Sequence, residues 1–116
     1  MSKKNEMKRV EKKWGAELWV ANCAEYCGKL LYLKQGAQCS HHYHPVKKET
    51  FYVIQGSLSL TIEGKESMMN PLTQPKTIMP GQKHFFKGIT EAVIMETSTH
   101  HDDKDVVRLN ESRLLA

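Results

Sequence analysis

A series of short apolar or alternating runs, each bounded by turn residues, constrains the fold of this chain more than any other feature. The clearest run is "SLSLTIEG", in which Leu58, Leu60 and Ile62 alternate with polar residues. Alternation with a period of two places one side of a strand on a core and the other side in water. Gly56 and Gly64 stand at its two ends and mark turns. The run therefore predicts a half-buried β-strand.

Runs of the same kind recur along the chain, and helical periodicity over a comparable length is absent. They are "ELWVAN", "YCGKLLYLKQG", "ETFYVIQG", "KTIMPG", "HFFKG" and "EAVIMETST". The last two are predicted to form a hairpin around Gly88, whereas the closing "NESRLLA" is compatible with a strand end or a short helical turn. Short strands at this spacing are typical of a single sandwich or barrel, and 116 residues leave room for one domain.

Basic residues crowd the first thirteen positions, which raises the question of a nucleic-acid surface. Six lysines and arginines alternate there with Glu6 and Glu11, and no aromatic residue precedes Trp14. This pattern predicts a flexible, solvated arm over residues 1–13, or a weak anion-attracting tail, and no nucleic-acid partner.

The sequence also bears on location. No apolar run approaches the roughly 18 residues that a membrane span needs, and the basic N-terminus has no apolar segment behind it. We therefore expect no membrane partner and a cytoplasmic location. The three cysteines are expected to be reduced thiols, and the spacing of Cys23 and Cys27 does not suit a structural zinc site.

Three of the six histidines fall within four positions, in "HHYH" at residues 41–44. His42 and His44 point the same way if this stretch is extended, which is what two imidazoles need to bind one metal. Glu49 shares its parity with two large apolar residues of "ETFYV", and a carboxylate facing a core is costly unless it is paired or bound to a metal. His84 opens the run "HFFKG". These four residues are candidate metal ligands; the alternative is that each histidine is an ordinary hydrogen-bonded residue.

The remaining histidines and the nearby lysines carry a weaker signal. His41 has the wrong parity to join the candidate ligands and is expected to be exposed. His100 and His101 lie in "STHHDDKD", where a loop is expected and a place at the mouth of a barrel is the alternative. Lys47 and Lys48 are expected at the surface, and contact of either with an anionic substrate is the alternative.

The histidine string, taken with the glycines around it, resembles the first motif of the cupin superfamily. Its fixed positions are Gly36, His42, His44, Glu49 and Gly56, with five, one, four and six residues between them. "PGQKH" is similar to the core of the second cupin motif, although its proline directly precedes the glycine and a glycine stands where that motif has asparagine. The resemblance implies an all-β fold over residues 14–116, a cupin β-barrel of two antiparallel sheets (a double-stranded β-helix, or jelly roll).

The resemblance also implies that His42, His44, Glu49 and His84 bind one divalent metal inside the barrel. Three imidazoles and a carboxylate suit manganese, zinc, nickel, cobalt or iron, with positions left for water or substrate. The identity of the metal does not follow from these ligands.

A finer resemblance, to the sugar-isomerase cupins, extends over most of the chain. These include D-lyxose ketol-isomerases and the isomerase part of type II mannose-6-phosphate isomerases. The similarity lies in Trp14-Gly15, Glu96-Thr97-Ser98, the acidic stretch at 102–105 and Val106-Val107-Arg108, whereas the closing Tyr-Gly-Arg of the phosphosugar members is absent. It implies a metal-dependent aldose–ketose isomerase that acts on a sugar or sugar phosphate through an enediolate. A homodimer is also expected.

Glu96 and Arg108 are the candidate catalytic residues. Glu96 shares its parity with Ala92 and Ile94, so it would end an inward-facing row and serve as the base that removes a carbon-bound proton. The alternative is a strand-end carboxylate paired with Arg108 or a lysine. Arg108 would neutralise developing charge, or would bridge acidic residues at the surface.

Two other functions are compatible with the same residues. A small metal-dependent dioxygenase would use the same ligands, and only the metal and oxygen consumption would separate it from an isomerase. A non-enzymatic metal-binding or sugar-binding module is the third interpretation, because a cupin fold by itself does not decide function.

Overall fold

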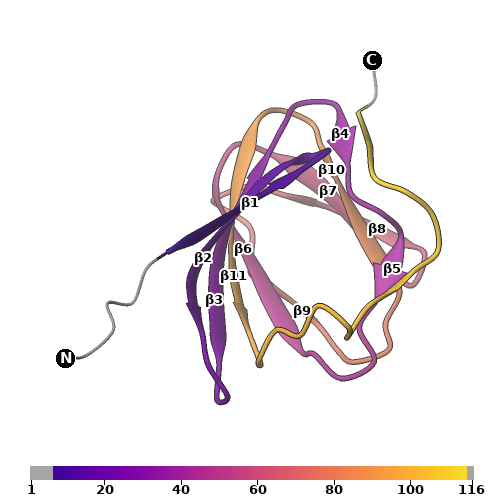
Figure 1. The fold of residues 1–116 in the computed structure, drawn as a ribbon. Helices are drawn as coiled ribbons and strands as arrows, with labels where there is room; N and C mark the ends of the chain where they lie inside the picture. Colours follow the sequence, from indigo (N-terminus) through magenta and orange to yellow (C-terminus); the bar gives the residue numbers. More distant parts are fainter. Residues whose placement is uncertain (1–6, 115–116) are drawn as a thin grey trace.

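A computed structural model describes residues 7–114 of the chain, and these residues form strands, turns and loops (Figure 1). The strands are β1 (Lys8–Lys12), β2 (Gly15–Asn22), β3 (Cys27–Leu33), β4 (Ala37–Gln38), β5 (His42–Tyr43), β6 (Glu49–Gln55), β7 (Leu58–Ile62), β8 (Lys65–Met69), β9 (Lys76–Ile78), β10 (His84–Gly88), β11 (Ala92–Ser98), β12 (Val107–Arg108) and β13 (Arg113–Leu114). Within residues 7–114 there is no helix long and apolar enough to cross a membrane.

Two antiparallel sheets face each other across a central space (Figure 1). One sheet has six strands in the order β1-β2-β3-β11-β6-β9. The other has seven, with β12-β5-β10-β4-β13 along one path and the β7–β8 pair joined to β10. This arrangement confirms the all-β, jelly-roll architecture expected from the sequence.

The core lies between the inner faces of the two sheets, where strand alternation places every second side chain. In β7, Leu58 and Leu60 are buried, as the alternation in "SLSLTIEG" predicts. They pack in one cluster with Phe51, Ile94 and Trp14 from the rest of the barrel. Within this cluster the rings of Trp14 and Phe86 pack edge to face, with 5.2 Å between their centres and 90° between their planes.

The predicted hairpin around Gly88 is wrong. β10 pairs with β7 in one sheet, whereas β11 pairs with β3 and β6 in the other, so the chain changes sheets between them. The corner is tight: a Cβ at Gly88 would lie 2.4 Å from the carbonyl oxygen of Lys34. Both strands bury an inner face, and pairing within one hairpin would leave one sheet without its central strand.

The predicted flexible arm over residues 1–13 is also corrected in part. Residues 8–12 form β1, which pairs with β2 along its whole length, from Lys8 opposite Trp19 to Lys12 opposite Gly15. Backbone hydrogen bonds to the open edge of β2 order this segment, and its charged side chains suit an edge strand. Residues 1–6 lie outside the described part of the chain. Near the other end, Arg113–Leu114 pairs with β4, so the strand alternative for "NESRLLA" holds.

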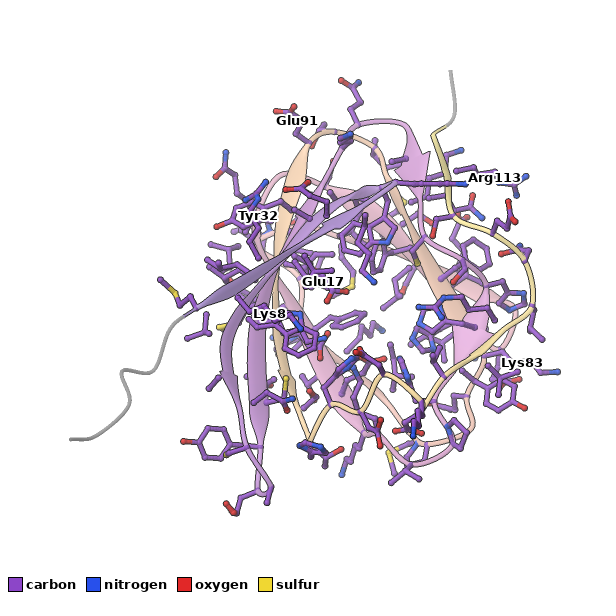
Figure 2. All side chains as sticks on the ribbon, in the orientation of Figure 1. Lys8, Glu17, Tyr32, Lys83, Glu91 and Arg113 are labelled. Carbon is purple, nitrogen blue, oxygen red and sulfur yellow. The ribbon has the colours of Figure 1, made fainter. Side chains whose placement is uncertain are left out.

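The outer face of the six-stranded sheet carries large apolar side chains. Tyr32, Ile54 and Met95 are 36%, 44% and 40% exposed. Figure 2 shows Tyr32 on the outer side of this sheet and Glu17 directed toward the interior. The structure holds a single chain, so the expected homodimer stays a prediction.

The sheet-to-sheet corner at Gly56 should be sensitive to a single methyl group. Its φ is +80°, and an added Cβ would lie 2.0 Å from the carbonyl oxygen of Glu91. We expect Gly56→Ala to lower the free energy of unfolding by about 3 kcal/mol or more, measured by urea denaturation.

Gly64→Ala is the matched control for this variant. Gly64 has nearly the same φ, +78°, but an added Cβ would have open space around it. It should lose about 1 kcal/mol, the conformational cost alone. Equal losses for the two variants would show that the contact with Glu91 does not matter.

Candidate metal centre

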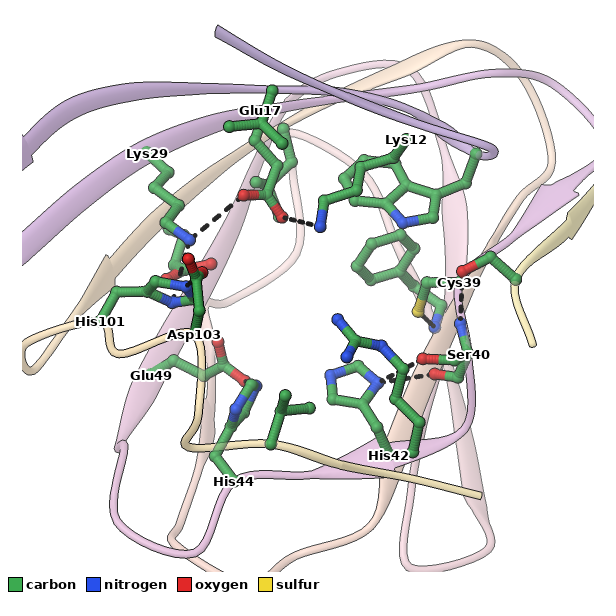
Figure 3. Close-up of a pocket in the computed structure, with 18 of the residues that line it drawn as sticks. Lys12, Glu17, Lys29, Cys39, Ser40, His42, His44, Glu49, His101 and Asp103 are labelled. Atoms are coloured by element: carbon green, nitrogen blue, oxygen red, sulfur yellow. Dashed lines mark hydrogen bonds and ion pairs between the residues drawn. The ribbon is translucent and has the colours of Figure 1, made fainter. Parts of the chain in front are cut away.

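A cavity of about 550 Å³ lies in the interior of the barrel, between the two sheets, and is open to solvent on one part of its surface (Figure 3). Figure 3 shows Lys29 and His101 together on one side of it and His42 on the other. A volume of this size lies in the range of about 300–1,000 Å³ that is usual for small-molecule sites.

The structure brings all four predicted ligands together at this cavity. One donor atom from each of His42, His44, Glu49 and His84 lies within 4.8 Å of the others. His42 and His84 sit opposite each other in the β5–β10 pair, and Glu49 begins β6. His84 and Glu49 are 1% and 2% exposed. Residues 42 positions apart in the chain thus meet because β5, β6 and β10 converge at one end of the barrel.

The hydrogen bonds of the three imidazoles aim their second nitrogens at one point. Each Nδ1 donates to a backbone carbonyl oxygen: His42 to Ser40 at 2.6 Å, His44 to Asp105 at 2.7 Å and His84 to Gln82 at 2.9 Å. Burial, and next the neighbouring His84, lower the pKa of His42 to about 3, so its ring is neutral. In a neutral ring with Nδ1–H, Nε2 carries a lone pair that can bind a metal.

Two buried atoms of the cluster have no hydrogen-bond donor in the described structure. They are Nε2 of His84 and Oε2 of Glu49, which lie 3.0 Å apart. Two lone pairs at this distance repel each other unless a proton or a metal ion lies between them. Donor atoms that share a metal at bonds of about 2.1 Å and at right angles also lie about 3.0 Å apart. The residues present therefore fit a divalent metal.

Glu49 is held in the ionised state that a metal needs. Burial would raise the pKa of Glu49, but hydrogen bonds from His44 and His84, made when their Nε2 atoms carry a hydrogen, and the ammonium of Lys47 outweigh it and hold the pKa well below its ordinary value. Cys39 also lines the cavity, yet burial raises the pKa of its thiol to about 12. It therefore stays protonated and is a poor ligand.

Lys47 lies inside the barrel, so its expected surface position is wrong. Its side chain is 3% exposed, and Nζ lies 3.3 Å from Oε1 of Glu49 and 3.2 Å from Oε2 of Glu96. The backbone turns it inward, because the carboxylate of Asp105 accepts the N–H groups of Val46 and Lys47, each at 2.9 Å. No parity argument could locate this residue, since it lies in a loop.

Glu96 ends the inward-facing row of β11, where its parity places it. It is 3% exposed, and its Oε2 also accepts a hydrogen bond from Ser98 at 2.9 Å. The alternative pairing with a lysine holds as well, and Lys47 is the partner. Glu96 is thus a buried, paired carboxylate beside the candidate metal ligands.

Arg108 lies on β12 directly opposite His42 in the β12–β5 pair and lines the cavity. It makes no ion pair with Asp103 or Asp105 among residues 7–114.

The two histidines of "STHHDDKD" differ in their positions. His101 lines the cavity, which is the alternative that the sequence left open, whereas His100 is exposed, as expected of a loop residue. Sequence reasoning missed the inward side chain of Lys29, although it shares its parity with the buried Cys27 and Leu31.

The comparisons with known proteins agree with this architecture. The family model described as "Cupin domain" matches residues 29–71. The capsular polysaccharide assembling protein CapF from Staphylococcus aureus superposes with a TM-score of 0.79 at 17% identity, over 92% of this chain and 35% of that chain. KdgF from Halomonas sp. superposes with a TM-score of 0.74 at 17% identity, over 86% of this chain and 90% of that chain.

Pac13, described as a unique nucleoside dehydratase, superposes with a TM-score of 0.76 at 12% identity, over 96% of this chain and 88% of that chain. The chain spans about a third of the length of CapF. No curated protein matches the chain by sequence. At these identities the structural likeness shows the fold alone.

Removal of one ligand should abolish metal binding. We expect the protein, purified without a histidine tag or chelator, to hold close to one divalent transition metal per chain and His44→Ala to hold almost none, as measured by elemental analysis. The reason is that the variant loses one of the four donors that would hold the metal.

His41→Ala is the matched control for this prediction. His41 neighbours the cluster in sequence but packs its ring against Phe85 at 5.3 Å. It should keep the metal content of the unmodified protein. A metal-free protein that takes up no metal on reconstitution would show that the four residues are not a metal centre.

Proposed function

Because the chain has the cupin fold around three imidazoles and a carboxylate, we propose that it is a metal-dependent aldose–ketose isomerase of sugars or sugar phosphates. The observation that carries the proposal is the buried pair of Glu96 and Lys47, placed beside the candidate ligand Glu49 in a cavity of about 550 Å³. Aldose–ketose isomerisation needs a base and a stabilised negative charge within one enclosed site.

The four candidate ligands would hold the metal through Nε2 of His42, His44 and His84 and the carboxylate of Glu49. A divalent ion there would polarise the substrate carbonyl and stabilise negative charge on the neighbouring oxygens.

Glu96 is the base in this proposal. Its carboxylate would take the proton from the carbon next to the carbonyl and return it to the former carbonyl carbon, while the hydroxyl proton passes between the two adjacent oxygens. This transfer is balanced without an oxidant or reductant. The β11 strand fixes Glu96 at the cavity wall, and Ser98 orients its Oε2 at 2.9 Å.

Lys47 supplies fixed positive charge in this proposal. Burial by itself would lower the pKa of Lys47, but the carboxylates of Glu96 and Glu49 outweigh it and raise the pKa above the ordinary value. The ammonium therefore stays charged, and its positive charge would stabilise the negative charge that develops on the enediolate. Arg108 lines the cavity beside His42, its neighbour in the β12–β5 pair, and would neutralise charge on the same substrate.

Two of the similar structures support a sugar substrate by their names. CapF is a capsular polysaccharide assembling protein and Pac13 is a nucleoside dehydratase, so both names point to molecules that contain sugars. The cupin fold hosts other chemistries, oxalate decarboxylase among the similar structures, so the site residues rather than the fold carry the proposal.

Loss of the Glu96 carboxylate should abolish isomerisation while the metal stays bound. We expect Glu96→Gln to lower kcat by about a hundredfold to ten-thousandfold, because it removes the base. The measurement is a panel of pentoses and hexoses, free and phosphorylated, followed by NMR in D₂O for exchange at the carbon next to the carbonyl and for the product isomer.

Glu91→Gln is the control, because Glu91 is an exposed glutamate just before the same strand. It should keep full activity. Unchanged turnover in Glu96→Gln would exclude Glu96 as the base. Metal-dependent oxygen consumption without any product isomer would favour the dioxygenase interpretation, and binding of a sugar without exchange would favour a binding module.

A further inference from the structure

Two buried lysines of the cavity end on the same atom of one histidine. Nζ of Lys29 lies 3.2 Å from Nδ1 of His101, and Nζ of Lys47 lies 3.3 Å from it. The side chains of these lysines are 1% and 3% exposed. Neither the proposed metal centre nor the proposed base includes His101, so its place between two buried ammonium groups needs a separate explanation.

The contacts determine the tautomer of His101. A lysine ammonium only donates hydrogen bonds, so Nδ1 must accept and carries a lone pair. Nε2 then carries the hydrogen and donates to Oδ1 of Asp103 at 2.9 Å. Burial, and next the charge of Lys29, lower the pKa of His101, which agrees with a neutral ring at this position.

We propose that His101, held in this tautomer by Asp103, is a positioning residue that orients the ammonium of Lys47 toward Glu96 and the candidate metal ligands. The three hydrogens of that ammonium have three acceptors around them. These are Oε1 of Glu49 at 3.3 Å, Oε2 of Glu96 at 3.2 Å and Nδ1 of His101 at 3.3 Å. Contacts on three sides restrict the directions in which this ammonium can point its N–H groups. The consequence for catalysis rests on the proposed isomerase function.

The ring of His101 is not needed to hold its own loop. Its backbone N–H donates to Oδ1 of Asn22 at 2.9 Å, and its carbonyl oxygen accepts from Nδ2 of Asn22 at 3.0 Å. These two bonds fix the loop against the end of β2 whatever side chain residue 101 carries. The ring also packs edge-on against Trp19, with 4.8 Å between the ring centres. Its polar contacts, apart from Asp103, are with the ammonium groups of Lys47 and Lys29.

Lys29 shares the lone pair of Nδ1 but has other partners. Its Nζ lies 3.2 Å from Oε1 of Glu17 and 4.3 Å from the ring centre of Trp19. The lone pair of Nδ1 is shared between the two ammonium groups and cannot fully satisfy both. Both positive charges are nevertheless held within 3.3 Å of this nitrogen. Loss of the ring would leave both ammonium groups with a buried N–H that has no acceptor.

The test uses the full chain with zinc added and lysine labelled with ¹⁵N. Ammonium hydrogens that exchange slowly with water give resolved NMR signals, and Lys47→Arg assigns the signal of Lys47. We expect a protected Lys47 signal in the unmodified protein, its loss in His101→Ala and its return in His101→Asn, whose side-chain oxygen can take the place of Nδ1. His100→Ala is the matched control, because within residues 7–114 the polar contact of His100 Nδ1 is with the Cys23 carbonyl oxygen, at 3.0 Å, and not with either lysine.

An unchanged Lys47 signal in His101→Ala, or no recovery in His101→Asn, would overturn the proposal. If His101→Ala fails to fold, the ¹⁵N signals of His101 in the unmodified protein decide instead: a hydrogen on Nδ1 would contradict the proposed tautomer. These readings need no enzymatic activity, so they stand even if the isomerase proposal fails.

Where isomerase activity is found, the same variants test the catalytic consequence. His101→Ala should lower kcat by about tenfold to a hundredfold with little change in KM. His101→Asn should restore most of the lost kcat. It should also flatten the acid side of the pH profile of kcat, because asparagine does not titrate. Full activity in His101→Ala beside a lost Lys47 signal would overturn the catalytic part of the proposal.

Discussion

The repulsion between two buried lone pairs is the constraint around which the interior of this barrel is arranged. Oε2 of Glu49 and Nε2 of His84 lie 3.0 Å apart without a hydrogen-bond donor in the described residues, and both side chains are almost fully buried. Such a pair is costly by itself, since each atom has lost its water and gained no partner. The backbone carbonyls that bind Nδ1 of all three imidazoles keep these rings aimed at the same point. The polypeptide thus holds in place an arrangement that a cation would stabilise.

The loop between β11 and β12 connects this centre to the acid–base residues. Its Asp105 uses three acceptors at once: the carbonyl oxygen for Nδ1 of His44 and the two carboxylate oxygens for the N–H groups of Val46 and Lys47. Its His101 contacts Nζ of Lys47 from the other side. This loop therefore orients both the candidate ligand His44 and the ammonium of Lys47 beside the proposed base. A substitution in the loop would affect the metal centre and the acid–base residues together.

Local periodicity explains why much of the fold and the two buried glutamates of the site could be predicted from the sequence. Leu58 and Leu60 follow a period of two, and the same parity places Glu49 and Glu96 on the inner face of their strands. A period-two signal needs only the strand itself, whatever the strand pairs with. The partner of a strand is a different matter. β10 and β11 follow each other closely in the chain but belong to different sheets, and β1 is ordered by the edge of β2 rather than by any apolar pattern of its own.

By itself, therefore, the sequence determined most of the longer strands, the buried parity of Glu49 and Glu96, and the candidate ligands His42, His44 and His84. Only the tertiary structure decided that Lys47 turns inward, that Arg108 lies beside His42 at the cavity, and that His101 lies between two ammonium groups. Lys47 and His101 lie in loops and Arg108 in a strand of two residues, where no repeating pattern dictates the direction of a side chain. Their directions follow from contacts with residues far away in the chain, such as Asp105 for the backbone of Lys47 and Asn22 for that of His101. Long-range contacts of this kind exist only once the two sheets have closed.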